Sequence, residues 1–142
     1  MSKIKIYLSG ADKQVCDDFQ TWRNECFYYQ MTGYYLNLEF INPLAHFNYT
    51  TRKPKTNKQC KDLFMWQIEK SDILLVNLDE SENSVGTGYE VERANCFNIP
   101  IIGFGDKPET WYSWTKESCS VVFDTLGEAI DYISESYGCI YE

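Results

Sequence analysis

The sequence predicts one α/β domain over residues 1–142, built on a five-stranded parallel sheet with helices on both faces. Strand-like and helix-like segments alternate along the whole chain, which favours parallel strands joined by crossover helices. Residues 72–78, "DILLVNL", form a continuous apolar run, typical of a central strand covered on both sides. No internal repeat or linker divides the 142 residues, a length that suits a single core.

The first half of the chain contains two strands and two helices. Residues 3–9, "KIKIYLS", alternate and then become apolar, as a first strand does. A helix is expected over 13–30 from the helical spacing of its apolar residues, and "YYLNLEFIN" (34–42) predicts the second strand. Pro43 ends that strand and opens a polar loop over 43–57, which a second helix (58–70) follows.

The second half continues the alternation. After the central strand we expect a loop over 79–86 and a helix that ends near Phe97. The remaining expected elements are a fourth strand (99–105), a tryptophan-bearing loop (106–119), a short strand (120–123) and a closing helix (126–137). Five strands in this arrangement suit the flavodoxin-like order 2-1-3-4-5.

Composition and charge narrow the class of partner. The chain carries 13 basic and 21 acidic residues, a net charge of −8, which argues against binding duplex nucleic acid or an anionic membrane. Six cysteines form no C-x-x-C pair and His46 is the single histidine, so no metal site is expected, and no organic cofactor is implied. We see no signal peptide and no membrane span, and expect a cytoplasmic protein with free thiols.

A ligand is expected where the strands end, near the switch between strands 1 and 3. The segments that meet there are "YLSGAD", "NPLAHF" and "NLDESENSVGTGYE", which makes Ser9 and Gly10 candidate substrate contacts. The turn after strand 1 lacks a dinucleotide fingerprint and a Walker P-loop, and it is too short and acidic for a flavin-phosphate loop. The acids near strand 1 that a phosphoreceiver domain needs are missing as well.

Two carboxylates and a tyrosine are the candidate catalytic groups. Glu90 is expected in the first turn of the third helix, where free N–H groups stabilise an anion, and Tyr7 is expected to orient it. Gly86 and Gly88 would let a sugar approach the backbone, and Asp72 is a candidate proton donor. Two such acids suit cleavage of a glycosidic bond. A surface charge at position 90 and a turn residue at position 72 are the plainer alternatives.

The same residues resemble the nucleoside 2-deoxyribosyltransferase family, in particular its phage and Gram-positive branch. "KIYLSG", "SDILLVNL", "SVGTGYEVERA" and "IPIIGFG" occur in that family's order and spacing, and the resemblance covers nearly the whole chain. It implies that Glu90 forms a covalent deoxyribosyl intermediate, that Tyr7 hydrogen-bonds this carboxylate and that Asp72 assists protonation of the base. The implied activity is N-glycosidic cleavage of a 2′-deoxynucleoside or its 5′-monophosphate, with transfer of the sugar to another base or to water.

The resemblance also assigns binding residues. Ser84 stands where the family holds the 5′ end of the sugar; a serine there is similar to the related 5′-monophosphate N-glycosidases, whereas an aspartate would repel phosphate. His46 and Phe47 would lie over the base. Ser118, in the tryptophan-bearing loop, would serve a neighbouring subunit, so a homo-oligomer is expected. The alternative is a catalytically inactive protein that binds or sequesters a nucleotide in the same crevice.

Overall fold

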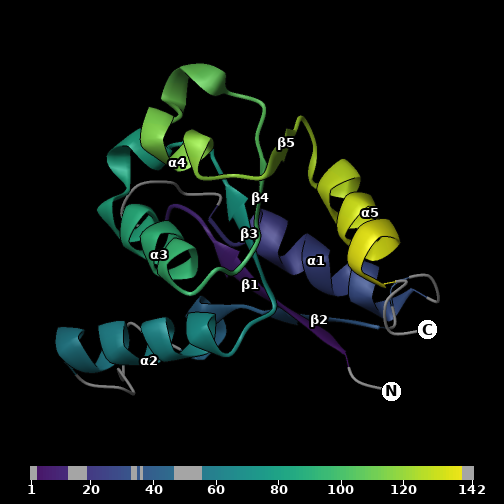
Figure 1. Cartoon of the computed structure of the whole chain (residues 1–142), viewed down its shortest axis with the longest axis horizontal. Coiled ribbons are helices and arrows are strands. Elements are labelled where there is room, and N and C mark those ends of the chain that lie inside the picture. The colour runs from purple at the N-terminus through teal and green to yellow at the C-terminus, as the bar shows by residue number, and fades with distance from the viewer. Residues whose placement is uncertain (1–2, 13–18, 33–34, 36, 47–55, 139–142) are drawn as a thin grey trace.

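A computed structural model of the chain describes residues 3–12, 19–32, 35, 37–46 and 56–138. The five strands are β1 (Ile4–Ser9), β2 (Leu38–Ile41), β3 (Ile73–Asn77), β4 (Ile101–Phe104) and β5 (Val121–Phe123). They form one parallel sheet in the order β2-β1-β3-β4-β5, which confirms the predicted order (Figure 1). β1 lies between β2 and β3, so the expected switch point exists.

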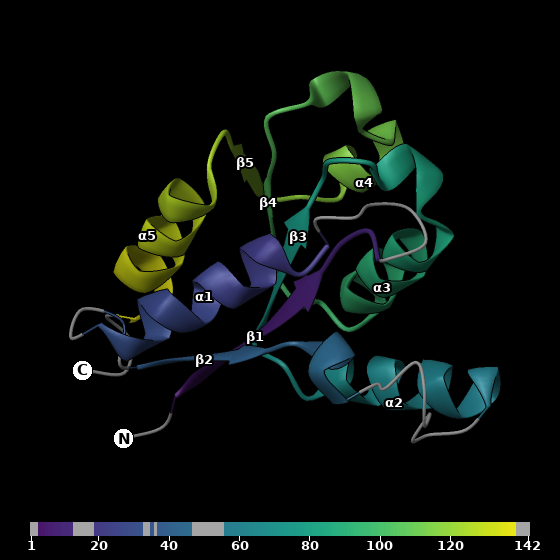
Figure 2. The ribbon, with the colours of Figure 1, turned by 180° about the vertical axis from the view of Figure 1, so that it is seen from behind.

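In the described part of the chain, five α-helices connect or follow the strands. They are α1 (Thr21–Met31), α2 (Asn57–Glu69), α3 (Val85–Cys96), α4 (Ser113–Glu117) and α5 (Leu126–Tyr137), with the short 3-10 helices η2 (Pro43–His46), η3 (Ser81–Asn83) and η4 (Pro108–Thr110). Figures 1 and 2 show α1 and α5 on one face of the sheet and α2 and α3 on the other. Within the described residues no helix is long and apolar enough to cross a membrane.

The alternation of side chains along β1 separates two cores. Ile4, Ile6 and Leu8 pack into the larger core together with α1 and α5. Tyr7 points to the opposite face and is fully buried in the smaller core with α2 and α3. The period-2 geometry of a strand therefore directs the tyrosine toward the helix that carries Glu90.

Several boundaries differ from the sequence prediction. The helix expected over 13–30 begins at Thr21, with residues 13–18 outside the described part of the chain, and the strand expected over 34–42 is confined to Leu38–Ile41. The beginning of the third helix differs for an identifiable reason. α3 begins at Val85, so the glycines at 86 and 88 are helical rather than part of a loop. Ser84 is the N-cap, and its side chain accepts a hydrogen bond from the Thr87 N–H, which starts the helix before the glycines can end it. The expected loop over 106–119 also contains η4 and α4.

The chain between β3 and α3 is fixed by side-chain hydrogen bonds. The Asp79 carboxylate accepts from the N–H groups of Asp106 and Lys107 and from the indole Nε1 of Trp111. Ser81 is buried, and its hydroxyl accepts from the Tyr112 N–H at 2.8 Å. These contacts set the position from which α3 begins.

Candidate functional site

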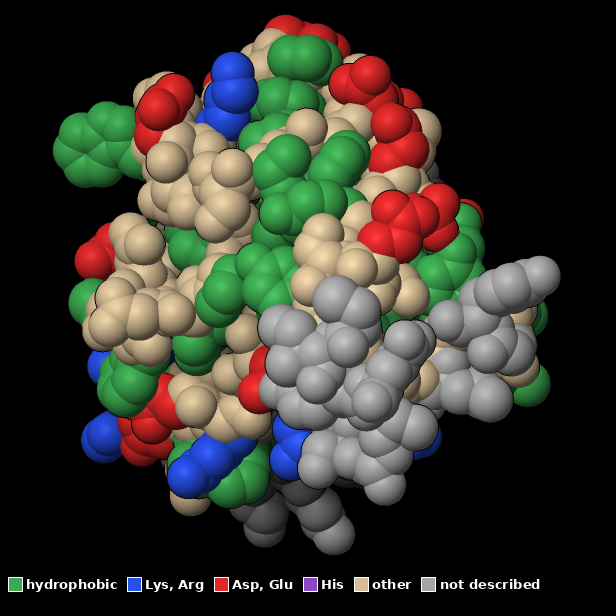
Figure 3. Space-filling view, turned by 45° about the vertical axis from the view of Figure 1, so that its right-hand side comes forward, with side chains coloured by type: hydrophobic (Ala, Val, Ile, Leu, Met, Phe, Trp, Pro, Cys, Tyr) green, Lys and Arg blue, Asp and Glu red, His purple; other side chains and the backbone are tan. Residues whose placement is uncertain are grey.

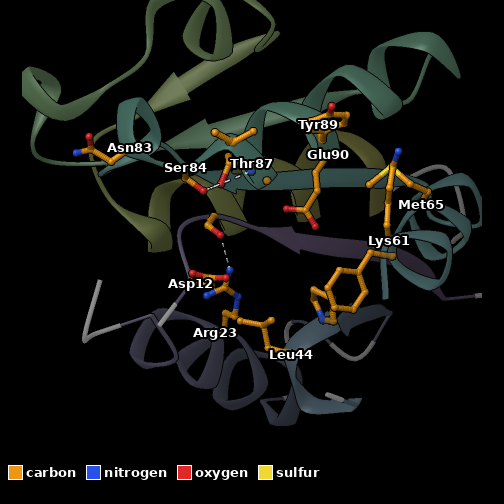
Figure 4. Close-up of a pocket in the computed structure, with 15 residues that line it drawn as sticks. Asp12, Arg23, Leu44, Lys61, Met65, Asn83, Ser84, Thr87, Tyr89 and Glu90 are labelled. Carbon is orange, nitrogen blue, oxygen red and sulfur yellow. Dashed lines mark hydrogen bonds between the residues drawn. The ribbon is translucent and has the colours of Figure 1, made fainter. Parts of the chain in front are cut away.

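A cavity of about 610 Å³ opens at the carboxyl ends of β1 and β3, between α1, α2 and the start of α3. All three segments expected at this edge contribute to its wall: Gly10 and Asp12 follow β1, Pro43 and Leu44 follow β2, and residues 83–87, 89 and 90 follow β3. Figure 4 shows Ser84 and Thr87 on one side of Glu90, and Lys61 and Met65 on the other. The cavity thus has two ends with a carboxylate between them.

Glu90 is held by two hydroxyl groups from β1. The Tyr7 hydroxyl donates to Glu90 Oε2, and the Ser9 hydroxyl donates to Oε1 at 2.9 Å. The Tyr7 contact is the one expected from the sequence. The expected stabilisation by free N–H groups is wrong, because α3 begins at Val85 and Glu90 therefore lies in its second turn.

Ser9 has a different place from the one expected. We expected it to contact substrate, but its side chain is fully buried and is engaged with Glu90. Gly10, the next residue, does line the cavity. β1 therefore contributes two donors that hold the carboxylate, and the residue directly after the strand lines the cavity.

Burial and neighbouring charges act on Glu90 in opposite directions. Removal from water raises the pKa of its carboxyl group to about 7, because a buried carboxylate loses hydration. The hydrogen bonds from Tyr7 and Ser9 and the positive charge of Arg23 act against this rise, while Asp12 adds to it. Near neutral pH the group therefore exists in both protonated and ionised forms.

Tyr7 itself stays protonated in this environment. Burial, and then the charge of Glu90, raise the pKa of the Tyr7 hydroxyl well above its usual value. The tyrosine is thus a hydrogen-bond donor to the carboxylate over the physiological pH range.

The α3 N-terminus forms one end of the cavity. The Ser84 and Thr87 hydroxyl oxygens lie 2.7 Å apart, and both residues line the wall. Gly86 also lines it, and a Cβ atom added there would meet nothing within 4 Å. Gly88, also expected to face the sugar, lines a second cavity on the far side of α3 and not this one.

Asp72 does not lie at the cavity. It directly precedes β3, at the amino end of the strand, and its Oδ2 accepts a hydrogen bond from the Lys5 N–H at 2.8 Å. The two ends of a parallel sheet are separated by the length of the strands, so an acid at the amino end is remote from a site at the carboxyl end. The structure brings Tyr7 and Glu90 together and leaves Asp72 apart.

Ser118 belongs to the second cavity, of about 580 Å³, between α3 and α4. Its hydroxyl donates to the Trp114 carbonyl oxygen at 2.9 Å. Trp111 packs against the smaller core, whereas Tyr112 and Trp114 are 42% and 74% exposed. The tryptophan-bearing loop (106–119) therefore places one of these aromatic side chains against the core and the other two at the surface.

His46 ends η2, whose first two residues line the main cavity, and Phe47 lies outside the described residues.

No cluster of three or more His, Cys, Asp or Glu side chains suited to a metal occurs in the part of the chain that the structure describes. Acidic side chains gather along one flank of the face in Figure 3, beside a band of hydrophobic ones.

Four lining residues were not anticipated from the sequence. Lys61, Phe64 and Met65 come from α2. Lys61 and Met65 lie at the end of the cavity opposite Ser84 (Figure 4). Arg23 comes from α1 and is only 1% exposed. A signal for Arg23 was present, because it interrupts the apolar face of α1 between Trp22 and Cys26, and an arginine on an inward face needs a polar partner.

Comparison with known proteins gives a match in fold. No protein-family model and no curated protein matches the chain. Among solved structures, a conserved protein from Enterococcus faecalis V583 superimposes with a TM-score of 0.74 at 13% identity, covering 94% of this chain and 99% of that one.

Two further solved structures carry a functional description. The 2-deoxyribosyltransferase from Bacillus psychrosaccharolyticus matches with a TM-score of 0.69 at 14% identity, covering 90% of this chain and 91% of that one. The 2-deoxyribosyltransferase from Leishmania mexicana matches with a TM-score of 0.67 at 14% identity, covering 94% of this chain and 99% of that one. The chain shares the fold of these proteins over nearly their whole length.

Proposed function

We propose that this chain, which has the fold of 2-deoxyribosyltransferases, cleaves the N-glycosidic bond of 2′-deoxynucleosides or their 5′-monophosphates through Glu90. The observation that carries the proposal is the Glu90 carboxylate in the main cavity, with Tyr7 and Ser9 hydroxyls hydrogen-bonded to its two oxygens. A carboxylate fixed in this way can attack an anomeric carbon in one defined direction.

The proposed reaction has two steps. In the first, a Glu90 oxygen forms a bond to C1′ of the sugar as the C1′–N bond breaks, and the electron pair of that bond goes to the base nitrogen, which takes up a proton. In the second, a nitrogen of another base, or water, attacks C1′, loses a proton and releases Glu90. Both transition states are oxocarbenium-like, so the nearby negative charge stabilises them.

The two ends of the cavity suggest how a substrate lies in it. Leu44, Phe64 and Met65 offer an apolar wall for a planar base. Ser84 and Thr87 offer hydroxyl groups at the other end, for the 5′ side of the sugar (Figure 4). In this orientation C1′ lies between the two ends, beside Glu90.

A 5′-phosphate is the favoured group at the Ser84 end. A hydroxyl can donate to a phosphate oxygen, and the first N–H groups of α3 lie behind Ser84. The charge of Asp12 in the same wall opposes an anion, so the preference over free nucleosides is expected to be moderate.

We further propose that the chain self-associates through the α3–α4 face. Tyr112 and Trp114 are exposed there beside Val85 and Tyr89, which also line the second cavity. Sedimentation of the wild-type protein and of Trp114→Ser tests this. A smaller oligomer in the variant supports it, and a wild-type monomer contradicts it.

Base release measured by chromatography tests the catalytic proposal. The wild type and Glu90→Ala would be incubated with 2′-deoxynucleosides and their 5′-monophosphates, with and without a second free base. We expect release that disappears in Glu90→Ala and persists in Glu92→Ala, a control with an exposed glutamate on the same helix. A new nucleoside in the presence of the second base indicates transfer.

Two outcomes would contradict the proposal. Undiminished release by Glu90→Ala would exclude Glu90 as the nucleophile. Absence of release from every substrate by the folded wild type, combined with binding of deoxynucleotides, would favour the alternative of a protein that binds or sequesters nucleotides in the same cavity.

A further inference from the structure

Arg23 is almost completely buried, although an arginine is among the residues least often found inside a protein. Moving a guanidinium out of water is costly unless its N–H groups are hydrogen-bonded and its charge is compensated. The contacts of Arg23 should therefore reveal what it does.

The hydrogen bonds of Arg23 go to backbone carbonyl oxygens. One terminal nitrogen donates to Gly10 at 3.0 Å, and the other donates to Ala11 at 3.4 Å and to Phe19. The third nitrogen, Nε, has no hydrogen-bond partner within the described part of the chain. The side chain thus ties the segment that leaves β1 to the beginning of α1 without involving a carboxylate in these bonds.

The backbone at Gly10, in the segment that leaves β1, is also closely packed. A Cβ atom added to Gly10 would lie 3.1 Å from the Trp22 ring and 3.3 Å from the Asn77 Cβ, so little space remains around it. Gly10 directly follows Ser9, whose hydroxyl holds Glu90. The Arg23 bonds therefore fix the backbone next to one of the two donors of the carboxylate.

Arg23 also lies close enough to affect the charge of Glu90. Both residues line the main cavity (Figure 4), and the guanidinium favours the ionised carboxylate while Asp12 opposes it. Burial lowers the pKa of Arg23, and the charges of Glu90, Tyr7 and Asp12 partly offset this. Among the residues that the structure describes, the titratable groups around Glu90 from the packed elements are Tyr7, Asp12, Arg23, Lys61 and Tyr89.

We propose that Arg23 is a positioning residue of this site: its buried guanidinium fixes the chain after β1 and places a positive charge in the wall of the cavity that holds Glu90. The inference deepens the proposed function, since the positive charge of Arg23 favours the ionised form of the buried Glu90, which is the form that can attack a sugar. An arginine guanidinium keeps its proton over the physiological pH range, so this charge is present throughout the range in which Glu90 titrates.

Titration of Glu90 in the substrate-free protein tests the proposal. Glutamate side chains labelled with ¹³C at Cδ would be followed by NMR from pH 5 to 9, and the signal absent from Glu90→Gln identifies position 90. We expect a midpoint near 7 in the wild type and, in Arg23→Gln, a midpoint about one pH unit higher.

Two variants separate charge from general disturbance. Arg23→Lys keeps the positive charge and loses the fork of donors, so the Glu90 midpoint should stay near the wild-type value while kcat falls. Arg93→Gln removes the same charge from an exposed arginine of α3, which pairs with Glu69 at 2.7 Å. The Glu90 midpoint should change little in this control, because solvent screens exposed charges.

A measurement on the wild type keeps the proposal testable if Arg23→Gln does not fold. The Nε–H signal of Arg23 should shift with a midpoint near 7 as Glu90 ionises, and this shift should be absent in Glu90→Gln. A signal unchanged between pH 5 and 9, or an unchanged Glu90 midpoint in folded Arg23→Gln, would overturn the proposal. Because both readouts need no substrate, they are independent of whether the protein releases bases.

Discussion

The Tyr7 hydroxyl donates a hydrogen bond to Oε2 of Glu90, joining two residues that are 83 positions apart in the sequence. The bond crosses the interface between β1 and α3 in the smaller core, so the carboxylate is oriented by the sheet rather than by its own helix. Together with the Ser9 hydroxyl, it leaves Glu90 with few directions in which to turn.

Tyr7→Phe should shift the activity profile to higher pH. The lost hydrogen bond stabilises the ionised form of Glu90, so its removal raises the pKa of Glu90 further above 7 and leaves less of the nucleophile at neutral pH. The pH dependence of kcat/KM measures this, with a loss of roughly 10- to 100-fold expected at pH 7. Tyr35→Phe, which removes a hydroxyl bonded to Asp131 away from the cavity, should leave the profile unchanged.

The ionisation of Glu90 should lower the stability of the wild type at alkaline pH. A folded-state pKa of about 7 exceeds the value of an exposed glutamate, so the folded state holds this proton more tightly than the unfolded state. The contribution of protonated Glu90 to the free energy of unfolding is therefore present at low pH and is lost as the pH rises toward and through 7. Urea unfolding at pH 5 and pH 8 should show a smaller decline for Glu90→Gln than for the wild type; parallel declines would contradict this.

Ser84→Asp should shift preference from 5′-monophosphates toward free nucleosides. Aspartate keeps the N-cap of α3, so the fold should be retained, but its charge repels a phosphate. Ser84→Asn is the matched control, because it also caps the helix and carries no charge. The ratio of kcat/KM for a deoxynucleotide and its nucleoside checks this, and an equal loss on both substrates would refute the assigned role.

Gly86→Ala and Gly88→Ala should separate stability from activity. Both glycines lie inside α3 with open space around them, so either substitution should stabilise the protein by about 0.5–1 kcal/mol. Gly86 faces the main cavity and Gly88 does not, so Gly86→Ala alone should raise KM. Thermal unfolding and steady-state kinetics on both variants test this; equal KM values would show that the cavity does not bind substrate at Gly86.

Asp72→Asn should leave activity within about twofold of the wild type, because the side chain lies at the amino end of β3. Asp12→Asn provides the contrast. It removes a negative charge that raises the pKa of Glu90, so its activity profile should move to lower pH. A loss of activity in Asp72→Asn with an unchanged fold would restore that residue as a candidate proton donor.

The sequence alone was sufficient for the order of the strands and for the edge of the sheet that carries the cavity. Both follow from periodicity and from the general geometry of parallel sheets, which need no knowledge of individual side-chain contacts. The contact between Tyr7 and Glu90 was also predictable, because Tyr7 lies near the carboxyl end of β1 and Glu90 follows β3. The same geometry places Asp72 at the amino end of β3, away from the cavity, although the family resemblance suggested a catalytic role for it.

The tertiary structure decided the features that depend on how neighbouring segments pack. α3 begins at Val85 because Ser84 caps it and because Asp79 and Ser81 fix the preceding chain. Glu90 therefore lies in the second turn of the helix and not in the first, which the sequence had predicted. Arg23 is buried because the carbonyl oxygens of Gly10, Ala11 and Phe19 accept its donors. Local sequence specifies which elements form, whereas hydrogen-bond partners and the space left between elements determine which side chains face the cavity.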